Sequence, residues 1–221
     1  MWKGFEMRNM KVIGRGRLSL RPDTTRITLT LGGVCPEYSE ALERSTSETS
    51  ALSELLALFG FKKTDLKTLA FNVESEYEGY SEDGVYKQRF KGYRFSHVLK
   101  VEFPSDNELL GRVLCALAGS PVKPELRLSY TVSDPEKAKN ALLAKAVADA
   151  GEKAQALADA ANVRLGEIQT IDYAWNDADF EARPEMRMLA AGAAPKAAFN
   201  LDITPEDIDV SDTVTVVWEI L

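Results

Sequence analysis

The chain has 221 residues, 45% of them hydrophobic and 28% charged, which predicts a soluble globular protein with one domain or two tightly joined lobes. A formal net charge of −7, with no run of lysines or arginines, argues against nucleic acid as a partner. No stretch approaches the roughly 20 apolar residues of a transmembrane helix, and the first residues lack the apolar core of a signal peptide. We therefore expect a cytoplasmic protein, or a periplasmic or envelope-associated one if a leader has been removed.

The first part of the chain predicts strands. Residues 1–9 form an N-terminal extension, and residues 10–33 predict two strands or one long bent one. Between residues 26 and 31 apolar residues alternate with threonines, a period of two that is typical of a strand with one solvated face. Pro22 cannot donate to a strand ladder, so we expect a bend or a sheet edge there.

A helix and a long hairpin follow. Residues 35–60 predict a helix that ends at a glycine, and the next strand is expected to change register near Phe71. The dipeptide Asp83-Gly84 is the strongest hairpin signal in the chain, with residues 85–103 as the partner strand. A second helix over 106–118, capped by Ser105, then leads to a strand over 124–132.

Residues 135–161 predict one long, alanine-rich helix of about 40 Å. Asp134 is the expected N-cap, Pro135 fits the first helical position, and Asn162 is the expected C-cap. The apolar stripe of this helix is mostly alanine, and such small side chains allow the neighbouring element to approach closely. We assign to this stripe Leu143, Val147, Ala150, Ala154, Leu157 and Ala161.

Two strands are expected at the end of the chain, over 165–175 and 209–221, with a long loop or insertion over 176–205 between them. A loop of this length in a compact domain usually carries function or is disordered. The predicted element order gives an α+β protein, a mainly antiparallel sheet with helices packed on one face.

Several motifs occur in an order that resembles the SIMPL domain family, a family of unknown function. They include Val12-Ile13-Gly14-Arg15-Gly16, Leu58-Phe59-Gly60, Gly92-Tyr93-Arg94-Phe95-Ser96-His97 and Ser133-Asp134-Pro135. The resemblance covers residues 10–221 as a single domain. It implies an assembly-forming module related to bacterial periplasmic immunogenic proteins and to a signalling molecule associated with a pelle-like kinase. Some members form ring- or channel-like oligomers in the envelope, members are associated with stress defence, and no catalytic residues carry over.

The chemical motifs have structural interpretations. Gly14-Arg15-Gly16 lacks the third glycine and the following helix of a dinucleotide loop, so close backbone packing is favoured. His97 is the single histidine, and we expect it to be hydrogen-bonded in or near the sheet. Cys35 and Cys115 match no metal or redox spacing; two reduced thiols are favoured over a disulfide. The acidic run from Glu74 to Asp83 predicts a solvated hairpin tip, or a site for a cation or basic partner.

No catalytic constellation, cofactor site or metal site is visible in the sequence, so we expect a non-enzymatic, homo-oligomeric scaffold or interaction protein. The alternative is a small-ligand-binding protein with a pocket between the sheet and the tyrosine-rich hairpin; an unrecognised enzyme ranks third. The candidate interaction residues are Ala150, Ala154, Leu157, Met186, Met188 and Leu189.

Overall fold

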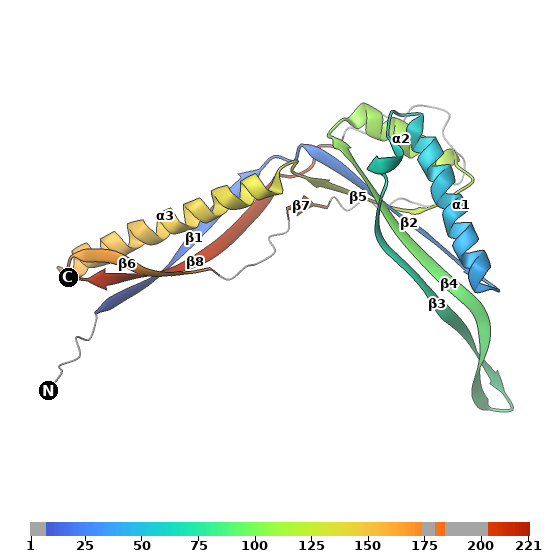
Figure 1. The fold of residues 1–221 in the computed structure, drawn as a ribbon, viewed down its shortest axis with the longest axis horizontal. Coiled ribbons are helices and arrows are strands. Elements are labelled where there is room, and N and C mark those ends of the chain that lie inside the picture. The colour runs from blue at the N-terminus through green and yellow to red at the C-terminus, as the bar shows by residue number, and fades with distance from the viewer. Residues whose placement is uncertain (1–7, 174–179, 184–202) are drawn as a thin grey trace. The chain divides into compact units, whose positions relative to one another are not determined.

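A computed structural model describes residues 8–173, 180–183 and 203–221 of the chain, which contain eight strands and three α-helices. The α+β class and the antiparallel sheets that the sequence predicts are confirmed. The elements are β1 (Asn9–Leu20), β2 (Thr24–Cys35), α1 (Tyr38–Ala57), the 3₁₀ turn η1 (Lys63–Asp65), β3 (Lys67–Glu82), β4 (Val85–Pro104), α2 (Asn107–Gly119), β5 (Glu125–Thr131), α3 (Pro135–Ala161), β6 (Leu165–Asp172), β7 (Glu181–Ala182) and β8 (Ile208–Ile220) (Figure 1).

The chain forms two compact units. Unit 1 combines the described residues of Met1–Pro22, Val132–Ala182 and Glu206–Leu221, and unit 2 those of Asp23–Thr131 and Arg183–Pro205. The interruption at Pro22 separates β1 from β2, so the predicted bend is a break between two strands of different units.

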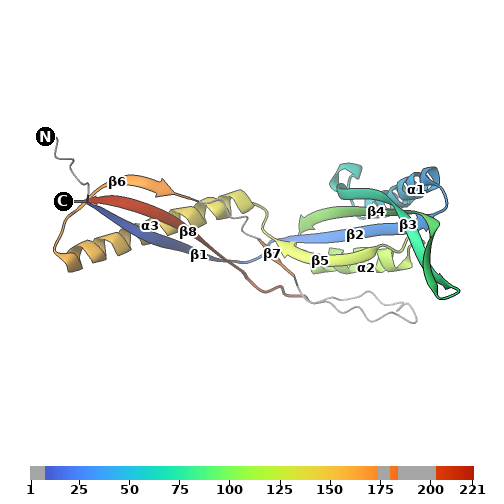
Figure 2. The same ribbon diagram turned by 90° about the horizontal axis from the view of Figure 1, so that it is seen from below.

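Unit 1 is a three-stranded antiparallel sheet of order β1-β8-β6, with α3 along one face (Figure 2). Alternate residues of β1 and β8 face the helix, as a period of two requires. The core beneath α3 contains Val12, Val214, Val216 and Trp218 together with three alanines of the helix.

Both ends of α3 have the predicted caps. The Asp134 carboxylate accepts a hydrogen bond from the backbone N–H of Lys137 at 2.9 Å, and Pro135 follows as the first helical residue. Asn162 adopts the left-handed conformation, with φ of 54°, and ends the helix.

The predicted close approach lies between α3 and β1. A Cβ built on Gly14 would lie 2.0 Å from the Ala146 carbonyl oxygen, and one on Gly16 would lie 2.1 Å from the Leu142 carbonyl oxygen. Only glycine fits at such distances, which explains the Gly-Arg-Gly motif as backbone packing. The buried stripe of α3 is Lys139, Leu142, Ala146, Ala150, Ala154 and Ala158.

The stripe assigned from the sequence is therefore wrong at several positions. Leu157 is 52% exposed, and Leu143 and Val147 are partly buried at the margin of the core. Ala146 and Ala150 lie against Gly14, where a larger side chain would push the helix away from the strand, and Leu142 continues the buried stripe against Gly16.

Unit 2 contains β3, β4, β2 and β5 as neighbours in that order, with α1 and α2 on one face (Figure 1). The inward residues of β2, such as Ile27 and Leu29, are fully buried beneath the helices. The N-cap of α2 is Asp106 and not Ser105: its carboxylate accepts hydrogen bonds from the N–H groups of Glu108 and Leu109.

The hairpin of β3 and β4 turns at the predicted dipeptide, where Asp83 and Gly84 have φ of 54° and 75°. The register of the two strands shifts between Thr68 and Ala70 and again between Glu76 and Tyr77. The first shift lies close to the predicted one near Phe71. Cys35 and Cys115 are both free thiols.

Candidate interaction surface

His97 lies on β4 and faces α1, among hydroxyl groups. Its Nδ1 is 3.0 Å from the Ser45 hydroxyl and 3.2 Å from the Thr49 hydroxyl, and its Nε2 is 2.9 Å from the Thr68 hydroxyl. The edge of the Phe71 ring packs against the imidazole, with ring centroids 5.0 Å apart. Partial burial lowers the pKa of His97, which favours the neutral ring.

A serine beside a histidine raises the question of a nucleophile and its base. Such pairs normally have a third group that orients the base, and the nucleophile must reach substrate. Here Ser45 is buried within a helix, and the second ring nitrogen meets a threonine hydroxyl instead of a carboxylate. The cluster ties α1 to β3 and β4. These hydroxyl partners could not be predicted from the sequence, because they come from two elements, α1 and β3, that are distant from His97 along the chain.

The outer part of the β3–β4 hairpin has two chemically different faces. In an antiparallel pair, residues directly opposite each other share a face, and successive pairs alternate between faces. Tyr77 lies opposite Phe90 and Ser81 opposite Tyr86, whereas Glu78 lies opposite Arg89 and Tyr80 opposite Lys87. One face is therefore largely aromatic and the other largely charged.

The aromatic face comprises Tyr77, Tyr86, Phe90 and Tyr93. The rings of Tyr77 and Phe90 meet edge to face at 5.7 Å, Phe90 meets Tyr93 at 5.3 Å, and Tyr93 meets Tyr38 of α1 at 5.6 Å. Tyr77, Phe90 and Tyr86 are 58%, 48% and 71% exposed. This row of rings thus leads from the N-terminal end of α1 onto the hairpin, and much of its surface is open to solvent.

A glycine makes this row possible. Gly92 has φ of 144°, and a Cβ at this position would lie 2.3 Å from the Cys35 carbonyl oxygen. It stands at the second register shift, where β4 has one more residue than β3. The extra residue places Phe90 and Tyr93 in contact although they are three positions apart.

The ion-pair face contains Glu78, Glu82, Lys87 and Arg89, together with Tyr80 and Val85. Arg89 donates to Glu78 from two guanidinium nitrogens, at 2.6 and 2.9 Å, and Lys87 donates to Glu82 at 2.7 Å. Farther from the hairpin tip, Arg94 forms a bidentate ion pair with Glu76. These pairs lower the pKa of Glu78 and of Glu76. The acidic run of the sequence is thus matched by cations of the partner strand.

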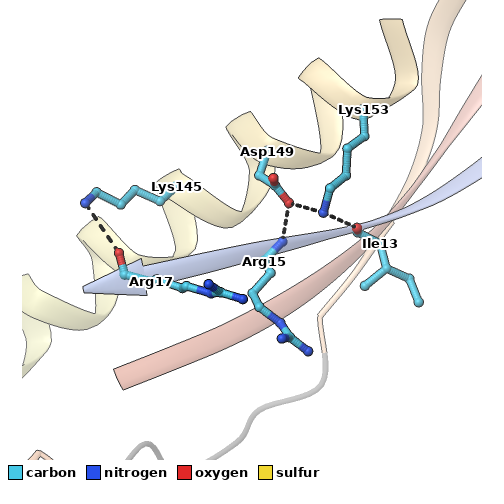
Figure 3. Close-up of a pocket in the computed structure, with 6 residues that line it drawn as sticks. All are labelled: Ile13, Arg15, Arg17, Lys145, Asp149 and Lys153. Carbon is cyan, nitrogen blue, oxygen red and sulfur yellow. Dashed lines mark hydrogen bonds and ion pairs between the residues drawn. The ribbon is translucent and has the colours of Figure 1, made fainter. Parts of the chain in front are cut away.

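Unit 1 carries a different polar surface, where α3 meets the outer edge of β1 (Figure 3). A hollow of about 550 Å³ is lined by Ile13, Arg15, Arg17, Lys145, Asp149 and Lys153. A second hollow of about 500 Å³ adjoins Arg15 and Arg17 and is lined further by Leu18, Ser19, Asp209, Val210 and Ser211. Neither involves the hairpin, where the small-ligand alternative expected a pocket.

The candidate interaction residues from the sequence fall into three groups. Ala150 and Ala154 are fully buried against the sheet of their own unit, so the subunit itself covers them. Leu157 is exposed on α3. Met186, Met188 and Leu189 lie outside the described residues, as does most of the predicted 176–205 loop; Phe180, at 9% exposed, belongs to a small core cluster of unit 1.

The described residues contain no group of three or more histidine, cysteine, aspartate or glutamate side chains that could hold a metal ion. None of the helices in this part of the chain is both long enough and apolar enough to cross a membrane.

Comparison with known proteins gives a consistent result. The chain is 25% identical over 211 residues to the uncharacterized protein YggE of Edwardsiella ictaluri (strain 93-146), which covers 94% of this chain and 84% of that protein. It is 24% identical over 189 residues to the uncharacterized protein YggE of Escherichia coli (strain K12), covering 84% and 72%. The model of the family described as SIMPL, protein of unknown function (DUF541), matches residues 10–218. The chain therefore belongs to the SIMPL family, as its motifs suggested.

Proposed function

We propose that this protein is a non-enzymatic interaction protein that assembles with copies of itself, and that the aromatic face of the β3–β4 hairpin is the assembly surface. The observation that carries the proposal is the division of this hairpin into an aromatic face and an ion-pair face. The resemblance to assembly-forming SIMPL proteins supports the choice of a second copy as partner, and it extends the proposal to a role in stress defence or at the envelope.

The energetics favour a partner on the aromatic face. An isolated two-stranded ribbon is at best marginally stable in water. Tyrosine and phenylalanine each bury about 150–250 Å² when covered, and aromatic residues are enriched in interface cores. The still exposed parts of Tyr77, Phe90 and Tyr86, with the partly buried Tyr93, supply part of the roughly 800 Å² per partner of a stable interface. Contact with another subunit would therefore stabilise the hairpin as well as the assembly.

The ion-pair face is unsuited to the same role. Its charges already satisfy one another within the hairpin, and exposed pairs of this kind contribute little to stability. Burying them in an interface would require desolvation with no new partner in return. The two faces thus supply a test and its control at the same distance from the hairpin tip.

The test replaces one cross-strand pair on each face. The Y77S/F90S variant removes two directly opposed rings from the aromatic face, and the E78Q/R89Q variant neutralises the adjacent pair on the other face without changing the net charge. We expect native mass spectrometry at micromolar concentration to show smaller species for Y77S/F90S only. Circular dichroism should show both variants folded, because all four side chains are exposed. Equal masses for Y77S/F90S and wild type would refute assembly through this face.

A further inference from the structure

β1 is an edge strand, and side chains of α3 lie along the edge that does not pair with β8. Among the strands that the structure describes, β1 pairs only with β8, so every second residue directs its N–H and C=O groups away from β8. Such a row of unpaired backbone groups is a template for an added strand. The outward backbone groups that α3 contacts belong to Ile13, Arg15 and Arg17.

Three helix side chains bind these groups in succession (Figure 3). The Asp149 carboxylate accepts the backbone N–H of Arg15 at 2.6 Å. The Lys153 ammonium lies 3.4 Å from the Ile13 carbonyl oxygen, and the Lys145 ammonium lies 3.4 Å from that of Arg17. Lys153 also pairs with Asp149 at 2.6 Å, which holds the carboxylate and the ammonium side by side.

The contacts between α3 and β1 repeat at a regular interval. Each step of four residues along α3 advances about 6.0 Å, and each step of two residues along β1 advances about 6.7 Å. Lys145, Asp149 and Lys153 are four residues apart, and their partners Arg17, Arg15 and Ile13 are two apart in the opposite direction. Gly14 and Gly16 bring the helix close enough for the short side chain of Asp149 to reach the edge.

The exposed side chains of β1 add an electrostatic barrier. Lys11, Arg15 and Arg17 all point to the open face of the strand. If a second β1 paired antiparallel about Ile13, Gly14 or Arg15, two of these cations would lie opposite each other, which destabilises a strand pair.

We propose that Lys145, Asp149 and Lys153 take the place of a neighbouring strand and close the edge of β1 against strand addition by a second copy of the chain. This role is separate from the proposed assembly through the hairpin, which lies in the other unit. It confines association to chosen surfaces, because an uncovered edge would permit unintended strand pairing.

The first test uses amide hydrogen exchange to measure how well the side chains of α3 protect the edge of β1. In D149A the Arg15 N–H loses its acceptor, and we expect its exchange to accelerate about tenfold, the effect of losing one net hydrogen bond. The Gly14 amide, which faces β8, serves as the internal reference. D159A removes the same charge from the same helix away from β1, and D149N retains an acceptor oxygen; both should leave Arg15 protected. Unchanged Arg15 exchange in D149A would overturn the proposal.

The second test asks whether copies of the chain associate once these side chains no longer cover the edge of β1. The triple variant K145Q/D149A/K153Q is made in the Y77S/F90S background, so that association through the hairpin does not mask the result. We expect sedimentation velocity to show new association that grows with concentration. K137Q in the same background changes the net charge by the same amount and should not associate further. A triple variant that associates no more than its parent would show that these side chains do not guard the edge, whatever the outcome for the hairpin.

Discussion

Replacing Gly14 with alanine probes the contact that positions α3 on its sheet. The added methyl would lie 2.0 Å from the Ala146 carbonyl oxygen and 2.6 Å from both the Cβ and the backbone nitrogen of Ala150. An ordinary carbon–oxygen contact is at least about 3.3 Å, so strand and helix must separate locally by about 1.3 Å. Overpacking of this kind costs about 1–3 kcal/mol, and we expect the upper end, because the obstacle is helix backbone rather than a flexible side chain.

Gly151 provides the matched control. It lies within α3, and an added Cβ would have no neighbour within 4 Å, so G151A should stabilise the helix by roughly 0.5–1 kcal/mol. Urea unfolding followed by circular dichroism measures both changes. For a chain of this size 1 kcal/mol corresponds to about 2–4 °C in Tm, so G14A should melt roughly 6–12 °C below wild type and G151A slightly above it. If G14A were as stable as wild type, the close approach of α3 to β1 would be refuted.

The remaining predictions concern the helix core and the histidine. A154F should destabilise the protein by about 1–3 kcal/mol in urea unfolding, because Ala154 is fully buried, whereas A156F on the exposed side should be near neutral; equal effects would contradict the assigned helix face. H97N should cost at most a modest amount of stability, because it removes hydrogen bonds that tie α1 to β3 and β4, and it should leave the mass of any assembly unchanged; loss of a defined activity would contradict this structural role. Because the pKa of His97 is lower in the folded chain, the unfolded chain takes up a proton more readily below about pH 6.5, and stability should fall from pH 7.5 to pH 5.5. H97N should make this fall shallower, and an identical pH dependence in H97N would show that His97 does not contribute to it.

Local signals predicted the ends of the elements well. The Asp134-Pro135 start and the Asn162 end of α3, and the Asp83-Gly84 turn, depend on backbone conformations that a few adjacent residues decide. The mistaken cap at Ser105 shows the limit of this reasoning, because the next residue, Asp106, has a side chain equally suited to the position.

The buried face of α3 was harder to predict, because alanines surround the helix and provide little contrast between its sides. The deciding feature is the close contact of Gly14 and Gly16 with the helix backbone at Leu142, Ala146 and Ala150, about 130 residues away in sequence. The same distance concealed the role of Asp149: a spacing of four residues from Lys153 favours an ion pair on a helix, and the pair exists, but nothing in the sequence indicates that it lies along the edge of β1.

The aromatic face could not be predicted from the alternation of residues along the two strands. The sequence showed tyrosines interleaved with acidic residues, but the register shift between Glu76 and Tyr77 decides which side chains share a face. That shift depends on Gly92 packing against the backbone of Cys35, a contact between distant segments.

The mass of the wild-type protein in solution tests the central claim most directly. Native mass spectrometry of the purified chain at micromolar concentration should show a discrete multiple of the chain mass. Dilution should shift it toward the single chain as the aromatic faces separate. A single chain at every concentration would contradict assembly through the hairpin.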